Sequence, residues 1–178
     1  MLDKLYITPR QWLHFLRWSL YSFVFLLAMM LQTVVLGNRT FFGVHPDFVP
    51  IVITCVCLRE GAERGGLFAL LTSVFWALSG IEYGSLHILL LTVLPIVGSL
   101  LSSRLLSSRL MPCFIWTLFT LWVLHSVIFI FQTAFSATDS SLYFSVLLPC
   151  VCVSALTQPV FYWLVKCIEN IGDKYESV

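Results

Sequence analysis

Long stretches of this sequence contain no Asp, Glu, Lys or Arg, and these uncharged windows limit what the chain can fold into. The windows span residues 18–38, 48–58, 65–81, 83–103, 110–138 and 140–165. A transmembrane α-helix needs roughly 20 mainly apolar residues to cross about 30 Å of hydrocarbon. Four windows reach that length, the third approaches it, and the second falls clearly short. The pattern predicts an all-α membrane protein with six transmembrane helices.

The composition supports a membrane environment. Hydrophobic residues make up 59% of the 178 residues and charged residues only 11%, whereas soluble domains carry about 25% charged residues. A formal net charge of +1 without a basic run gives no reason to expect nucleic-acid binding. We expect a single domain, residues 1–178, with membrane spans at about 18–37, 46–60, 65–80, 85–103, 112–135 and 142–166.

The positions of Lys and Arg predict the orientation of these spans, because cytoplasmic loops carry an excess of both residues. If the N-terminus is cytoplasmic, the one outward cation is Arg39, and nine cations face the cytoplasm: Lys4, Arg10, Arg17, Arg59, Arg64, Arg104, Arg109, Lys166 and Lys174. The short outer loops then carry the acidic residues Asp47, Glu82 and Asp139. We therefore expect both termini on the cytoplasmic side.

The short second window, within the stretch HPDFVPIVITCVCLREGAERGG (residues 45–66), allows two interpretations. The second and third windows either form a re-entrant hairpin or each cross the membrane. A hairpin would bury the charged turn of Arg59, Glu60, Glu63 and Arg64, at a cost of about 2.5–3.5 kcal/mol per charge. A crossing places this turn in the cytoplasm, where Arg59–Glu63 and Glu60–Arg64 are i, i+4 neighbours on a continuing helix. We favour the crossing.

A crossing second helix would leave a recess on the outer side. Asp47 is a suitable N-cap, so the expected helix runs from Phe48 to Arg64. At about 1.5 Å per residue this helix is about 25 Å long, shorter than the hydrocarbon core. The expected recess is a candidate site because it holds ionisable groups at membrane depth; its residues are His45, Pro46, Asp47 and Glu82. The alternative is that Asp47 only caps the helix and His45 lies in interfacial water.

Small residues recur at every fourth position of the third expected helix. They form a ridge of Gly61, Gly65, Ala69, Ser73 and Ala77. Small residues let two helices approach closely inside a membrane. The ridge therefore predicts either close packing within the chain or a surface that binds a partner's transmembrane helix, and these five residues are candidates for a partner interface.

The sequence shows no familiar catalytic or metal-binding motif. It contains no H-E-x-x-H, G-x-S-x-G, P-loop or G-x-G-x-x-G pattern, so we expect no catalytic residue, metal, cofactor or enzymatic activity. His125 and Gln132 share a face of the fifth expected helix, where polar side chains more often link helices than relay protons. The six cysteines are expected to behave as small buried hydrophobes: Cys55, Cys57, Cys113, Cys150, Cys152 and Cys167.

Three stretches follow one another along the chain: HPDF (residues 45–48), LREGAERGG (58–66) and ALSGIEYGSLHILLLTVLPIVGSLLSSRL (77–105). In this order they resemble the rod shape-determining MreD family of bacterial inner-membrane proteins. The resemblance covers roughly residues 20–135 and includes the arrangement of six spans. The chain departs from the family at Trp76, a position where relatives often carry Asp, so the role of that Asp does not carry over.

The resemblance implies a noncatalytic scaffold of the cell-elongation machinery in the bacterial plasma (inner) membrane. Such a protein contacts membrane lipid and the single-span protein MreC, and through MreC it associates with cytoskeletal filament proteins and peptidoglycan synthases. The resemblance also implies a fold similar to the six-helix substrate-binding subunits of energy-coupling-factor transporters. The alternative function is a small-molecule-binding membrane subunit of a transporter, with the outward recess as its pocket.

Overall fold

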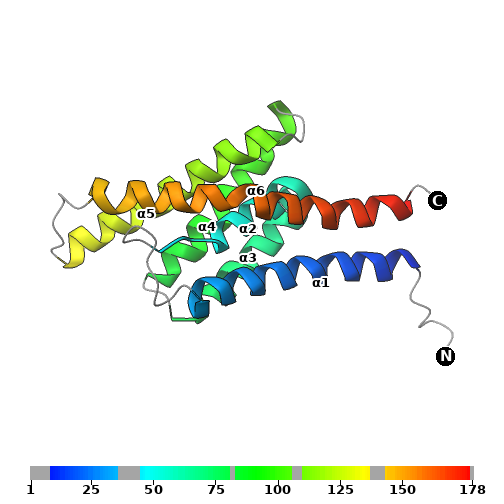
Figure 1. Ribbon diagram of the computed structural model, residues 1–178, viewed down its shortest axis with the longest axis horizontal. Helices are drawn as coiled ribbons and strands as arrows, with labels where there is room; N and C mark the ends of the chain where they lie inside the picture. The colour runs from blue at the N-terminus through cyan, green and yellow to red at the C-terminus, as the bar shows by residue number, and fades with distance from the viewer. Residues whose placement is uncertain (1–8, 36–44, 81–82, 106–109, 137–142, 177–178) are drawn as a thin grey trace.

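The computed structural model describes residues 9–35, 45–80, 83–105, 110–136 and 143–176. These residues form six α-helices and one short π-helical segment: α1 (Pro9–Met30), η2 (Leu31–Val35), α2 (Val49–Glu60), α3 (Ala62–Leu78), α4 (Gly84–Leu105), α5 (Leu110–Ser136) and α6 (Tyr143–Glu176). The first turn of α1 and the last turn of α6 lie at the same end of the helical bundle (Figure 1).

Four helices are long and apolar enough to cross a membrane. Their apolar segments are Gln11–Val34, Gly84–Ser102, Leu110–Phe135 and Leu147–Asn170. The chain is therefore a multi-pass membrane protein. The other two helices are shorter: α2 has 12 residues and α3 has 17, which correspond to lengths of about 18 Å and 26 Å.

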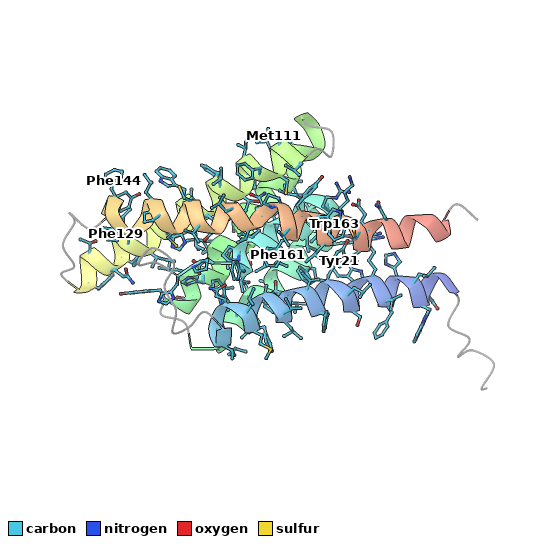
Figure 2. The ribbon with its side chains drawn as sticks, in the orientation of Figure 1. Tyr21, Met111, Phe129, Phe144, Phe161 and Trp163 are labelled. Carbon is cyan, nitrogen blue, oxygen red and sulfur yellow. The ribbon has the colours of Figure 1, made fainter. Side chains whose placement is uncertain are left out.

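The outside of the bundle is apolar, as a surface in contact with lipid requires. Phe144 on α6, Met111 on α5 and Trp163 on α6 are exposed, whereas Tyr21 and Phe161 are buried between helices (Figure 2). In water such an exposed apolar surface would promote association. In a bilayer the same side chains contact lipid tails at no cost.

The short helix α2 is the centre of the bundle. All nine residues from Val49 to Cys57 are buried, and α2 packs against each of the other five α-helices (Figure 1). A helix that is hydrophobic all round belongs inside a protein. The second window can be shorter than a membrane span because protein, rather than lipid, surrounds it.

The predicted extension of this helix to Arg64 is wrong. Helix α2 ends at Glu60, and Gly61 then adopts φ of +90° before α3 begins. This left-handed region is readily accessible only to glycine, and it turns the chain back along α2. The break removes the helical spacing on which the expected i, i+4 pairs of the charged turn depended.

The charged turn pairs with other helices instead. Arg59 donates from Nε to Glu169 of α6 at 2.6 Å, and Glu60 pairs with Arg17 of α1 at 2.5 Å. Tyr21 also donates its hydroxyl to Glu60, at 2.6 Å. The first two residues of the turn therefore tie the end of α2 to the first and last helices of the chain.

The small-residue ridge packs α3 inside the chain. A Cβ atom on Gly65 would lie 2.5 Å from the Cα atom of Cys57 on α2, so the two backbones touch. Ala69 and Ser73 are fully buried, and the Ser73 hydroxyl lies 3.3 Å from that of Thr92 on α4. The ridge therefore holds a helix hairpin together.

A partner cannot reach the buried middle of this ridge. We therefore correct the assignment of the ridge as a partner interface, which comprised Gly61, Gly65, Ala69, Ser73 and Ala77. The two end residues are half-buried, and neither provides a surface by itself. The physical reason is that the small side chains are already used for close approach between α3 and its neighbours α2 and α4.

The contact at Gly65 yields a prediction about stability. Gly65→Ala should lower the stability of the folded protein by about 1–3 kcal/mol, the usual cost of overpacking, because the new methyl group meets backbone atoms. Gly66→Ala is the matched control, since its methyl group would meet only the flexible end of the Ile96 side chain, at 2.9 Å. Thermal unfolding in detergent measures both, and equal melting temperatures would contradict the close approach.

Candidate functional site

Polar side chains from distant parts of the chain meet at the start of α2, opposite the charged turn. His125 on α5 lies with Nε2 3.0 Å from Oδ2 of Asp47. Cys150 on α6 lies with Sγ 3.6 Å from the same nitrogen and donates to the carbonyl oxygen of His45 at 3.2 Å. We call Gln32, Asp47, His125 and Cys150 the polar cluster.

Gln32 connects this cluster to the beginning of α2. Its side-chain oxygen accepts hydrogen bonds from the backbone N–H groups of Phe48 at 3.0 Å and Val49 at 3.2 Å. Its side-chain nitrogen donates to Oδ1 of Asp47 at 2.6 Å. The first N–H groups of a helix have no partner within the helix, so Gln32 caps α2 from a neighbouring segment. Gln32 lies in η2, and π-helical turns occur frequently at functional positions.

Asp47 does not cap α2, contrary to the sequence-based expectation. The N-cap residue is Phe48, and no side chain of the usual capping type serves it. The backbone N–H of Asp47 donates to the Ser154 hydroxyl at 2.9 Å, and its carboxylate faces His125 and Gln32. The carboxylate therefore contacts side chains of other helices rather than the first turn of α2.

The structure brings together only part of the predicted recess. Asp47 is half-buried, Pro46 is buried and His45 is exposed. Glu82 lies outside the described residues. The partners of Asp47 are instead Gln32 and His125, and the side chains of Asp47 and His125 are only 18% and 21% exposed. The candidate site is therefore deeper and nearer to α5 and α6 than the recess predicted from sequence.

Sequence reasoning missed two members of the cluster. Gln32 is not among the candidates that the sequence predicts, and Cys150 is predicted only as a buried hydrophobe. One signal was present: Gln32 and His125 are polar residues in the uncharged windows 18–38 and 110–138, and polar groups in such windows face the protein interior. The pattern cannot tell which of these polar groups meet.

A small cavity gives the cluster an open side. Its volume is about 170 Å³, and its polar lining comes from His125, Gln132 and Cys150. The remaining lining residues are Ile128, Phe129 and Leu147. Gln132 therefore shares a cavity with His125, as their common helix face predicted.

The geometry of the cluster limits its chemistry. A Cys-His-Asp catalytic triad uses both ring nitrogens of histidine, one toward the nucleophile and one toward the carboxylate. Here Cys150 and Asp47 both face Nε2 of His125, so His125 cannot relay a proton between them in this arrangement. A thiol, an imidazole and a carboxylate that converge within 4.8 Å are instead a set that can share a cation.

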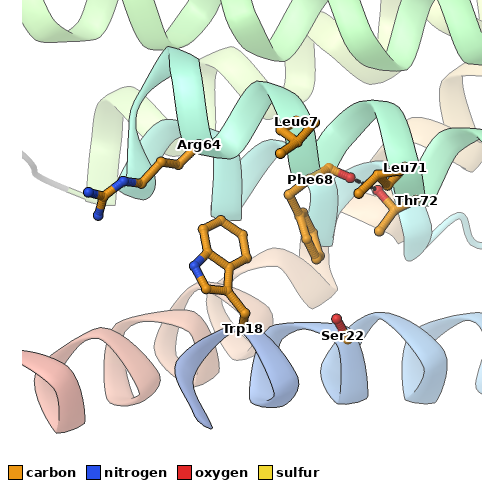
Figure 3. A pocket seen from close by; sticks show the side chains of 7 residues that line it. All are labelled: Trp18, Ser22, Arg64, Leu67, Phe68, Leu71 and Thr72. Carbon is orange, nitrogen blue, oxygen red and sulfur yellow. Dashed lines mark hydrogen bonds between the residues drawn. The ribbon is translucent and has the colours of Figure 1, made fainter. Parts of the chain in front are cut away.

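A second candidate site is a groove between α1 and α3. Its volume is about 490 Å³, and its lining is formed by Trp18, Ser22, Arg64, Leu67, Phe68, Leu71 and Thr72. Figure 3 shows Trp18 reaching from α1 toward α3 and Phe68 reaching from α3 toward α1. The centres of these two rings are 6.0 Å apart, and their contact forms the floor of the groove.

No protein-family model, no curated protein and no solved structure matches this chain. The relation to the MreD family and the similarity of fold to energy-coupling-factor subunits therefore stay predictions that rest on the sequence stretches quoted above.

The cap formed by Gln32 yields a second prediction. Gln32→Leu should destabilise the protein by about 1–3 kcal/mol, because buried backbone N–H groups at the start of α2 lose their acceptor. Thr33→Val is the matched control, since the exposed Thr33 hydroxyl bonds only to Met29 of its own helix. Chemical unfolding in detergent measures both variants. If Gln32→Leu were as stable as Thr33→Val, the cap would have no energetic role.

Proposed function

We propose that this protein is a noncatalytic scaffold of the bacterial cell-elongation machinery, related to the MreD family. Its groove between α1 and α3 binds the transmembrane helix of a single-span, MreC-like partner. Through that partner the protein associates indirectly with cytoskeletal filament proteins and with peptidoglycan synthases. The stretches that resemble the MreD family support the biological setting, and the groove supports the mode of binding.

The groove is the observation that carries this proposal. Its walls are mostly apolar, and its neighbouring residues Leu67 and Leu71 are well exposed. In a bilayer, helices associate by close packing rather than by hydrophobic exclusion from water. A preformed groove of about 490 Å³ accepts the side chains of a helix that lies along it. Lipid tails would fill the same groove less completely.

A charged residue at one end of the groove favours a protein partner. Arg64 lines the groove and is exposed, and its guanidinium lies 3.4 Å from the His14 ring. Among the described residues, no carboxylate forms a salt bridge with Arg64. A carboxylate beside the transmembrane helix of the partner would pair with it and fix the register of docking.

The size of the cavity beside the polar cluster argues against the transporter alternative. Sites for small organic ligands usually measure about 300–1,000 Å³. The cavity beside His125 measures about 170 Å³, which is too small for a vitamin-sized molecule. The larger groove is lined by side chains of two helices, α1 and α3 (Figure 3), as expected for a contact with another membrane helix.

The scaffold requires a defined topology, and we propose six passes with both termini in the cytoplasm. Helix α2 counts as a pass although it is short, because the other helices cover it. Helix α3 counts as a pass because its 17 residues reach the lower end of the length of a membrane span. The charged turn then lies at the cytoplasmic side together with the ends of α1 and α6 (Figure 1). Its Arg59 and Glu60 pair with charged residues of those helices, which places these charges at one level.

Cysteine labelling tests this topology. Ala62→Cys and Ser79→Cys mark the two ends of α3, each on a background without native cysteines. An impermeant thiol reagent should label Ser79→Cys in intact cells and Ala62→Cys only after permeabilisation. Labelling of both positions from outside would show that α2 and α3 form a re-entrant hairpin.

Filling the groove tests the scaffold function. Ser22→Trp and Leu71→Trp should each reduce co-purification of the co-expressed full-length MreC-like protein by roughly tenfold, because overpacking costs about 1–3 kcal/mol and about 1.4 kcal/mol is tenfold in binding. Leu156→Trp on α6 is the matched control, since Leu156 is 79% exposed and lies outside the groove. If the groove variants retain the partner but lose a bound lipid, the groove is a lipid site and the proposed docking is wrong.

A further inference from the structure

We propose that Asp47, His125 and Cys150 bind a divalent transition-metal ion, and that zinc is the ion their chemistry fits best. The three residues come from the start of α2, from α5 and from α6. Their ligand atoms all lie within 4.8 Å of one another. The site is independent of the groove and of the scaffold function.

Two of the three distances between ligand atoms are close to those of a tetrahedral zinc site, and the third is within 4.8 Å. Zinc bonds of about 2.3 Å to sulfur and about 2.0 Å to nitrogen or oxygen, at tetrahedral angles, place sulfur and nitrogen ligands roughly 3.5 Å apart. Sγ of Cys150 and Nε2 of His125 are 3.6 Å apart. The same geometry places nitrogen and oxygen ligands roughly 3.3 Å apart, and Nε2 lies 3.0 Å from Oδ2 of Asp47. Small side-chain shifts would complete the coordination.

The surroundings of the cluster also suit a metal. Gln32 donates to Oδ1 of Asp47 at 2.6 Å, which orients the carboxylate so that Oδ2 faces His125. Hydrogen bonds of this kind to a ligating carboxylate strengthen metal sites. The cavity of about 170 Å³ borders both His125 and Cys150, and it leaves room for a fourth ligand such as water.

The identity of the donors selects among metals. One thiolate, one imidazole and one carboxylate form a mixed set that suits zinc and excludes magnesium or calcium, which prefer oxygen ligands. Binding requires the thiolate form of Cys150 and a free lone pair on Nε2 of His125. Metal binding displaces two protons. The thiol proton, which now points to the carbonyl oxygen of His45, is released to the surrounding water. The proton on Nε2 that faces Asp47 leaves as well, so that the neutral ring carries its proton on Nδ1.

Cobalt substitution tests the site directly. The purified protein in detergent, stripped with a chelator, should bind one equivalent of Co²⁺ and show a thiolate-to-cobalt charge-transfer band. Cys150→Ser should abolish this band. Cys152→Ser is the matched control and should retain it, because Cys152 lies two residues away on the same helix and is exposed. Cys113→Ser should also retain the band, which excludes the buried pair Cys55 and Cys113, whose sulfur atoms are 3.6 Å apart.

Zinc binding provides a second readout that does not depend on colour. Excess Zn²⁺ should raise the melting temperature of the unaltered protein, since a ligand that binds only the folded state stabilises it. His125→Asn should weaken Zn²⁺ binding by about tenfold or more, and Cys150→Ser should abolish the thermal shift while retaining the helical circular dichroism spectrum. Less than stoichiometric metal, or a cobalt band that survives in Cys150→Ser, would overturn the proposal.

Discussion

The burial of a helix shorter than the hydrocarbon core of the membrane is the constraint on which the rest of this structure depends. Inside a bilayer the terminal N–H and C=O groups of such a helix cannot bond to water, and each unsatisfied group costs several kcal/mol. The start of α2 meets this requirement with Gln32. Its end is the Gly61 turn, where the backbone N–H of Gly61 still donates to the carbonyl of Cys57 at 3.1 Å. The other five α-helices surround α2 and bury the residues between its two ends.

The charged residues next to the Gly61 turn determine how the helices are positioned more than they stabilise the folded protein. Ion pairs that leave water recover little net energy, because desolvation offsets their attraction. Arg59 and Glu60 nevertheless make contacts that are specific in direction, the first to α6 and the second to α1. Because the two adjacent residues have opposite charges, each pairs with a different helix. This arrangement fixes the register of the first and last helices against the central one.

Charge distribution and apolar length were sufficient to predict six helices, because both properties are local to each window. The end of α2 at Glu60 was harder, since helix propensity and i, i+4 pairing both favoured a continuation that one glycine interrupts. The contacts of the polar cluster could not be predicted, although Asp47 was a candidate and Gln32 and His125 are polar residues in uncharged windows. Its contacts join residues 15 and 25 positions apart, as between Gln32 and Asp47 and between His125 and Cys150, and only the packed bundle brings these pairs to one point.

Helix α1, with its extension η2, takes part in the groove, in the contacts of the charged turn and in the cap of α2. Trp18 lines the groove, and the adjacent Arg17 pairs with Glu60. Gln32 caps α2 about 21 Å along the chain from Trp18, at about 1.5 Å per residue. A displacement of α1 away from α3 would therefore break an ion pair at one end and a cap at the other. Because both ends are held, the groove is preformed, as the proposed docking of a partner helix requires. A preformed surface of this kind loses less entropy on binding than one that must be ordered by its partner.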